Sequence, residues 1–589
     1  MIQIIFSVIT DQWRIILGIL LFIGLCGILV SLALKNILGK HLTSNEYLTL
    51  GMAGWLLPAS LISVLWFLFG LQSLAPFSLF LLISLIVILI FFFLRFKPYS
   101  EPDSRSTSFF LLLFFSVSIL LRLVFVSKAI LPSYFDSAQH YLLIKTILGE
   151  NTNGLIASLT TNYYHLGFHF VAAFAVSMVQ AEIGKVMLIL GQMILAVMPL
   201  AIFFLIKYAI KSNLAGIFAI GLSAYGWYMP AHAVDWGKYP ALLSLGVIPF
   251  ILGLAYLLSQ TKDTLSPPKR WTLALMLGFG VLVSGFMHSR SLVVIGITFL
   301  AWLIAVWWGK LQQVQQFSLF ILVIVAVILE IIFIQKHDVL LLLFDPYIHK
   351  GVLATVLVLL LAVFAYRQYS QLTFACILTM GFLMGSLFIP VKGLVPGYAN
   401  LTLLDRPFVE MILFLPLSFL GGLGLAGFEK LIQYPKLRIC VDLIACGFVF
   451  INAFATYDLY PSDCCVLVGN DDLTAMDWMN TQLPTDAHIG ISATELKVLA
   501  SESFEGYVGG DAGIWITPLI NRATFPIRYD TNFAEQTTLE LLCQRNISQL
   551  YVGELGQTFN DAQLSAQPTW YKMLLYMPKV RVYQVVGCK

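Results

Sequence analysis

Long apolar runs constrain the fold of this chain more than any other feature. Of its 589 residues, 59% are hydrophobic and 11% are charged, whereas soluble domains carry roughly 25% charged residues. A helix that spans a membrane needs about 20 mostly apolar residues. The runs exclude a soluble globular fold and predict an α-helical polytopic membrane protein. Fourteen spans are expected, at 15–37, 47–71, 75–97, 108–127, 184–206, 214–232, 240–258, 271–287, 291–308, 317–335, 351–366, 373–389, 408–428 and 438–457.

The composition changes sharply at Asp458. The segment 458–589 carries 15 acidic and 8 basic residues and has the composition of a soluble domain. Alternating short helical and strand patterns in it predict a small α/β domain with a parallel or mixed sheet. The expected elements are helices at 472–481 and 538–546 and strands at 488–492, 549–553 and 581–586. The chain is thus divided into N-terminal helices at 1–107, a membrane module at 108–457 with a loop at 128–183, and the domain at 458–589.

The apolar segment 163–179 is not counted as a span. It is short and carries polar side chains, which are costly against lipid, so a juxtamembrane or re-entrant helix is expected. The loops on one face then hold ten Lys and Arg residues and those on the other hold seven. By the positive-inside rule the richer face is cytoplasmic. Both termini, the loop 128–183 and the C-terminal domain are therefore expected outside the cytoplasm.

The cysteines give no metal-site signal in the sequence. Cys464, Cys465, Cys543 and Cys588 lie in the C-terminal domain, and no C-x-x-C or Cys/His spacing points to zinc. An extracytoplasmic domain can hold a disulfide among these four, but its connectivity does not follow from the sequence.

Asp136 is the main candidate catalytic residue. It follows the expected span 108–127 closely, after Pro132, where a new helix should begin with Asp136 or Ser137 as its N-cap. In the alternative, functional interpretation, the carboxylate is a general base that takes the proton of an attacking hydroxyl. His140 is four residues further on, so one helical face would present both side chains and His140 could orient the acceptor or the carboxylate.

A few basic residues in short outer loops are candidates for binding a phosphate. Arg290 with His288 is the first choice and Lys238 the second, and Arg406 is a further candidate, because such loops hold the side chains near lipid head groups. The alternative is that these side chains only snorkel to the interface. Asp235 is then expected to pair with Lys238 across one helical turn, and Asp405 to cap the helix that Arg406 begins. His165 and His169 are also four apart and are interpreted as cleft-lining groups rather than metal ligands, because no third ligand is near.

These features resemble the polytopic glycosyltransferases of the GT-C superfamily. In that family an outer loop carries a catalytic acid close after a span, as Asp136 does, and is followed by a juxtamembrane helix. The stretch Tyr163-Tyr164-His165-Leu166-Gly167-Phe168-His169 looks like a variant of that helix start without its prolines. Ser137 stands where many members have a second acid. The C-terminal domain is similar to that of bacterial members, in the segments Ala475-Met476-Asp477-Trp478-Met479, Gly509-Gly510-Asp511-Ala512-Gly513-Ile514-Trp515, Asn521-Arg522 and Leu550-Tyr551-Val552-Gly553.

The resemblance covers about 108–589 and implies a function. Such enzymes transfer a sugar from a polyprenyl-phosphate donor, with inversion, to a glycan, lipid or protein acceptor on the outer face of the bacterial inner membrane. No cofactor is implied with certainty, and the lone acid does not support a divalent metal. A glycan polymerase or ligase that relies on Arg and His is a second hypothesis, and a lipid-linked sugar transporter a third, although no inverted repeat is evident. Membrane lipids are expected partners, and nothing in the charge pattern favours nucleic acid.

Overall fold

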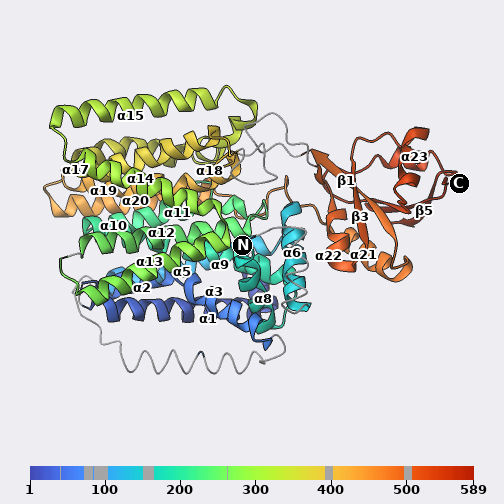
Figure 1. The fold of residues 1–589 in the computed structure, drawn as a ribbon, viewed down its shortest axis with the longest axis horizontal. Helices are drawn as coiled ribbons and strands as arrows, with labels where there is room; N and C mark the ends of the chain where they lie inside the picture. The colour runs from blue at the N-terminus through green and yellow to red at the C-terminus, as the bar shows by residue number, and fades with distance from the viewer. Residues whose placement is uncertain are drawn as a thin grey trace.

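The computed structural model describes residues 1–39, 41–71, 84, 104–149, 165–261, 263–391, 402–495 and 507–588. Its helices form an elongated bundle, and the C-terminal sheet domain sits at one end of it (Figure 1). This end is called the sheet end below. Apart from residue 84, the span expected at 75–97 lies outside the described residues.

The described residues hold ten helical stretches that are long and apolar enough to cross a membrane, and a bent helix pair makes an eleventh. The protein is therefore a polytopic helical membrane protein. The stretches comprise α1 (Ile2–Leu38), the bent pair α2 (Ser44–Ala53) and α3 (Leu56–Leu68), α5 (Ser104–Val126), α9 (Ile183–Val197) with α10 (Leu200–Ile210), α12 (Tyr239–Gln260), α13 (Pro267–Met287), α14 (Arg290–Trp308), α15 (Gln313–Ile334), α17 (Val352–Gly385), α18 (Arg406–Ile412) with α19 (Phe414–Glu429), and α20 (Pro435–Thr456).

Three of the expected spans differ in the structure. The span expected at 214–232 is a shorter helix, α11 (Asn213–Tyr225), and the chain after it forms a loop with the 3-10 turn η2 (Ala231–Ala233). The spans expected at 351–366 and 373–389 are parts of α17, which has a non-helical residue at Tyr369. Phe320 contacts both Tyr366 and Phe374, on either side of that residue, with ring centroids 4.0 and 6.2 Å apart. The helix is therefore kinked at Tyr369, which lies between the two predicted spans.

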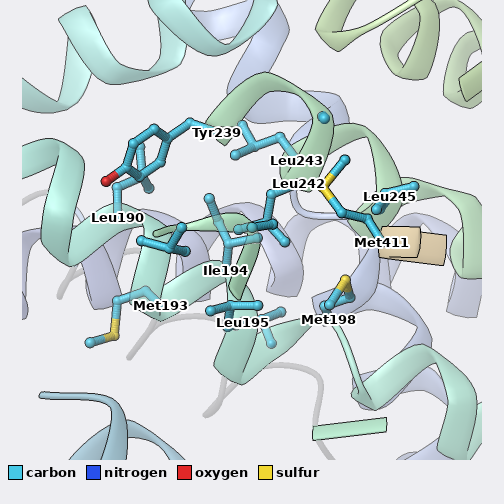
Figure 2. Packing of buried hydrophobic residues seen from close by; sticks show 14 of the residues in the cluster. Leu190, Met193, Ile194, Leu195, Met198, Tyr239, Leu242, Leu243, Leu245 and Met411 are labelled. Carbon is cyan, nitrogen blue, oxygen red and sulfur yellow. The ribbon is translucent and has the colours of Figure 1, made fainter. Parts of the chain in front are cut away.

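The centre of the bundle is formed by α9 and α12. Every residue of α9 except Lys185 is buried, and Figure 2 shows Leu190, Ile194 and Leu242 among the packed side chains of this core. Gly191 makes the close approach possible, because a Cβ there would lie 2.7 Å from the ring of Tyr239. In lipid there is little hydrophobic driving force that brings two helices together. The contact between α9 and α12 is therefore stabilised mainly by the dense packing of these aliphatic side chains.

Two shorter helices lie at the sheet end, α6 (Tyr134–Gly149) and α8 (Gly167–Val179) (Figure 1). The 13 residues of α8, at about 1.5 Å per residue, give about 20 Å, which is shorter than a hydrocarbon core of about 30 Å. Its length agrees with the expected juxtamembrane or re-entrant helix. Tyr163 and Tyr164, which belong to the expected start of this helix, lie outside the described residues.

The C-terminal domain is a mixed six-stranded sheet with the order β2-β1-β4-β6-β5, in which β3 also pairs with β1. β1 is parallel to β3 and β4, whereas β6 is antiparallel to β4 and β5. The predicted α/β fold and its five expected elements are confirmed; β2, β3 and β5 were not predicted. The elements are α21 (Asn470–Gln482), β1 (His488–Glu495), β2 (Tyr507–Gly509), α22 (Ile516–Ile520), β3 (Ala523–Arg528), α23 (Gln536–Gln544), β4 (Gln549–Val552), α24 (Asp561–Ser565), β5 (Tyr571–Tyr576) and β6 (Arg581–Val585).

The sheet domain docks on α6. Lys145 donates to the backbone carbonyl of Pro518 and to Asn521 Oδ1, both at 2.8 Å. Tyr141 packs edge-to-face on the buried Trp515, with ring centroids 5.6 Å apart. The sheet domain is therefore in direct contact with the helix that carries Asp136 and His140.

Candidate active site

Asp136 lies in the first turn of α6, because the helix begins at Tyr134 rather than after Asp136. The expected N-cap role of Asp136 or Ser137 is therefore wrong: Ser137 donates to the carbonyl of Ser133, inside the helix. The Asp136 carboxylate instead forms an ion pair with Lys238. Both side chains stay partly exposed, at 20% for Asp136 and 31% for Lys238.

A glycine brings Lys238 to Asp136. Gly237 has a φ of 64°, in the left-handed region that favours glycine. A Cβ at Gly237 would lie 2.5 Å from Ser137 Oγ and 2.9 Å from its backbone nitrogen. The loop before α12 can therefore press against the first turn of α6, and this places the Lys238 ammonium beside the carboxylate.

Asp235 does not pair with Lys238 as the sequence suggested. Its Oδ2 is 2.8 Å from His232 Nδ1, and its Oδ1 accepts the backbone N–H of Ser462 at 2.9 Å. Asp235 is buried. It thus fastens the loop before α12 to the segment that leads into the sheet domain, and with His232 and Tyr228 it lines a small pocket.

Arg290 forms a second ion pair at the same end of the bundle. It begins α14 and pairs with Asp405, which comes from the start of α18. Asp405 also accepts the backbone N–H of Phe408 at 3.0 Å, so its predicted role as an N-cap is confirmed. Arg406 points to Glu410, with 3.9 Å between Nε and Oε2. Arg290 and Asp405 are 26% and 12% exposed, so solutes can reach this pair too.

Four histidines close to these ion pairs contact one another in two pairs. His140 Nδ1 is 3.0 Å from His169 Nε2, and His165 Nε2 is 2.8 Å from Ser289 Oγ. His165 also stacks on His288, with ring centroids 4.7 Å apart. His165 and His169 therefore have separate partners, and only His169 lies within α8. His140 is 1% exposed, and its contact with His169 joins α6 to α8.

Burial keeps these imidazoles neutral. Burial, together with a smaller effect of the Lys238 charge, lowers the pKa of His140 to about 3. Burial also holds the pKa of His288 well below the usual value, and neighbouring His165, Arg290 and Lys238 add to this effect. Neutral histidines supply hydrogen bonds without adding charge, so the carboxylates, the ammonium and the guanidinium groups set the electrostatics.

The two ion pairs belong to one group, called the sheet-end cluster below. Lys238 and Arg290 both act on the pKa of His288, and Lys238, Asp136 and Arg406 all act on the pKa of Tyr134. The side chains of the two ion pairs therefore share one electrostatic environment. The cluster consists of Asp136, Lys238, His288, Arg290, Asp405 and Arg406.

One comparison with known proteins bears on this site. Residues 49–385 match the model of a family of unknown function, DUF6541, and the match covers more than half of the chain. The chain belongs to this family. The part that matches the DUF6541 model includes Asp136, Lys238 and Arg290 but ends before Asp405 and the sheet domain. No curated protein matches the chain.

Sequence reasoning found most members of the cluster in this DUF6541 protein but not their pairing. Asp136 and Lys238 are 102 residues apart, and Arg290 and Asp405 are 115 apart. Asp405 was interpreted only as a cap, and its second bond to Arg290 was missed. One sequence feature pointed to the cluster: each of these charges lies next to a short loop at the end of a span. Loops on the same face of a membrane protein meet at the same end of the bundle, so such charges can be expected to lie near one another.

Proposed function

We propose that this DUF6541 protein is an inverting membrane glycosyltransferase of the GT-C type. It transfers a sugar from a polyprenyl-phosphate donor to a glycan, lipid or protein acceptor. In this proposal it lies in the bacterial inner membrane, with the sheet domain outside the cytoplasm. The observation that carries the proposal is the sheet-end cluster, in which Asp136 pairs with the partly exposed Lys238 and Asp405 pairs with the partly exposed Arg290.

The cations suit a phosphate that arrives from the bilayer. Arginine and lysine bind phosphate through charge-assisted hydrogen bonds, and Lys238 and Arg290 are each held by a carboxylate from another element. An incoming phosphate competes with Asp136 and Asp405 for these cations. The carboxylates thus keep two otherwise repelling cations in place until the donor binds.

The same competition activates the base. A nearby cation stabilises the charged form of a carboxylate and lowers its basicity. When the donor phosphate takes Lys238, Asp136 loses this cation and becomes a better proton acceptor. Donor binding and base activation are then coupled in one exchange of ion-pair partners.

The transfer step follows from this arrangement. Asp136 accepts the proton of the acceptor hydroxyl while the oxygen of that hydroxyl forms a bond to the anomeric carbon. The bond from that carbon to the phosphate oxygen breaks, and the polyprenyl phosphate leaves with the electron pair. Lys238 and Arg290 stabilise the charge that develops on the phosphate. Attack opposite the leaving group inverts the anomeric centre.

The neutral histidines and the sheet domain support the machinery. The bond between His140 and His169 ties α6 to α8, and Lys145 ties α6 to the sheet domain. Both contacts fix the helix that carries Asp136. A general base must be held within hydrogen-bond reach of its hydroxyl, so a rigid α6 favours this role.

The first experiment compares transfer by Asp136→Asn with that of wild type. Purified protein in proteoliposomes is supplied with a panel of radiolabelled polyprenyl-phosphate sugars and acceptors. Removing a general base costs roughly 10²–10⁴-fold in rate, so the variant should fall by that factor. Asp486→Asn, the same change at an exposed position of the sheet domain, should leave the rate unchanged. Wild-type transfer by folded Asp136→Asn would remove Asp136 from the mechanism.

A second candidate function is a lipid-linked glycan polymerase or ligase. The stacked pair of His165 and His288 beside Arg290 favours it, because such enzymes rely on arginine and histidine. Loss of product with Arg290→Ala, together with an unchanged rate for Asp136→Asn, would select this function.

A further inference from the structure

A group of metal-ligating side chains lies outside the proposed site. Ligand atoms of His232, Cys464 and Cys465 all lie within 4.8 Å of one another. His232 belongs to η2, in the loop before α12, and the two cysteines follow α20 in the segment that leads to the sheet domain. More than 200 residues separate the histidine from the cysteines, which explains why the sequence spacing gave no sign of this group.

The histidine is held in the orientation that a metal ligand needs. Its Nδ1 lies 2.8 Å from Asp235 Oδ2, and this leaves Nε2 to face outward from the pair. A carboxylate on the second ring nitrogen fixes the ring and raises the basicity of a ligating histidine. Asp235 also accepts the N–H of Ser462, so the same carboxylate holds the cysteine segment against the histidine.

The two cysteines form a disulfide with each other in this structure. A disulfide sulfur lacks the thiolate charge that binds a metal. Cys464 is exposed, whereas Cys465 and His232 are buried. A reductant can therefore reach one sulfur of the bond from solvent, while the other two ligands remain fixed.

We propose that reduction of the Cys464–Cys465 disulfide opens a Cys2His site for a zinc-class divalent cation. A dithiol reductant supplies two electrons and two protons, the S–S bond breaks, and the reductant becomes a cyclic disulfide. The cation then displaces the two thiol protons and binds two thiolates and the neutral imidazole. Two cysteines and one histidine form an established zinc ligand set, in which water takes the fourth position.

The site is connected to α6 by a direct contact. The carbonyl of Cys465 accepts the backbone N–H of Tyr134 at 2.9 Å, and Tyr134 precedes Asp136 by two residues. Tyr228, in the loop before α12, donates to Ser462 at 2.8 Å. A change from disulfide to metal dithiolate therefore acts on the segments that carry Asp136 and Lys238. The metal site itself does not rest on the proposed function.

The test uses the full chain in detergent, with ZnCl2 as the probe. Protein as isolated and protein reduced with dithiothreitol are desalted without oxygen, incubated with zinc and analysed for bound metal. The reduced protein should bind one zinc ion per chain and the oxidised protein none. Equal zinc content in both forms, or none in the reduced form, would overturn the proposal.

Variants assign the ligands. Cys464→Ser/Cys465→Ser and His232→Gln should lose the zinc, and Asp235→Asn should weaken binding about 10- to 100-fold. The matched control is Cys543→Ser/Cys588→Ser, which removes the other disulfide and should still bind one ion after reduction. Zinc retained by Cys464→Ser/Cys465→Ser would contradict the assignment.

A second measurement needs no variant. In reduced wild-type protein, zinc should protect Cys464 and Cys465 from alkylation by iodoacetamide, as read by peptide mass spectrometry. Cys543 and Cys588 in the same sample should be alkylated at the same rate with and without zinc. Equal alkylation of Cys464 and Cys465 in both conditions would also overturn the proposal.

Discussion

The acids of the sheet domain and those of the sheet-end cluster are bound in different ways. In the sheet domain, Asp511 is fully buried and its oxygens accept the N–H groups of Gly513 and Gly553 at 2.9 and 3.2 Å. Asp472 accepts from Gly469, Tyr551 and Glu554. In the cluster, Asp136 is partly exposed and meets the flexible side chain of Lys238.

This difference separates structural from exchangeable carboxylates. Backbone donors are fixed by the fold, so a carboxylate that they hold stabilises that fold and has no other partner to take. A lysine side chain can move to another anion without unfolding anything. Asp511 therefore belongs to the structure of its domain, as do Trp515 and Arg522, which are buried.

The strongest test of the comparison is to remove the exchangeable cation. Lys238→Ala should lower kcat/KM for transfer about 10²–10³-fold, the cost of losing one group that stabilises developing charge. Steady-state transfer assays with a lipid-phosphate sugar measure this. Lys579→Ala, an exposed lysine of the sheet domain that pairs with Glu554, is the control and should leave kcat/KM unchanged. A change of less than threefold in Lys238→Ala would show that Lys238 does not act on the phosphate.

Removing a structural acid should instead affect stability. Asp511→Ala leaves two buried backbone N–H groups without their acceptor and should lower the unfolding free energy of the sheet domain by about 1–3 kcal/mol. Hydrogen exchange at Gly513 and Gly553 in the full chain reports this change. Transfer per folded molecule should stay near wild type. If transfer were lost while exchange stayed slow, Asp511 would have a role in catalysis.

The pH dependence of stability tests the buried imidazole beneath the cluster. The pKa of His140 is about 3 in the folded protein and about 6.5 when unfolded, so the unfolded state binds the proton more strongly. Its contribution to stability is complete above pH 6.5 and is lost as pH falls towards 3, by at most about 1.4 kcal/mol per pH unit. Thermal unfolding in detergent between pH 7 and 4 measures this. His140→Gln should reduce the slope, and an equal slope in both proteins would contradict the account.

The smallest change in stability is expected at the contact between α6 and the sheet domain. Lys145→Ala removes two hydrogen bonds from α6 to the segment around α22 and should cost about 1 kcal/mol. Faster hydrogen exchange in α22, with the strands of the sheet unchanged, is the expected result. Uniform exchange throughout the domain would show that docking does not depend on Lys145.

Sequence reasoning predicted the elements that depend on local patterns. The apolar runs gave most of the spans, and the helices α21 and α23 and the strands β1, β4 and β6 follow their periodicity. It failed where a short element depends on its neighbours. β2 has three residues and is stabilised by its pairing with β1, and the span predicted to reach residue 232 ends at Tyr225 although the apolar pattern continues.

The site shows the same limit. The positions of Asp136, Lys238 and Arg290 at the ends of spans were visible in the sequence, because charges are rare in this chain. Their partners were not, since each ion pair joins two elements more than 100 residues apart. The left-handed Gly237, which allows the loop of Lys238 to approach α6, is one of 42 glycines and nothing local distinguishes it.

The most direct test measures donor affinity and single-turnover transfer in the same Asp136→Asn preparation. The neutral amide holds Lys238 less firmly than the carboxylate does. The account therefore predicts a polyprenyl-phosphate sugar that binds at least as tightly as in wild type, with transfer slowed by about 10²–10⁴-fold. Transfer at an undiminished rate, or loss of donor binding with the transfer of bound donor unimpaired, would contradict it.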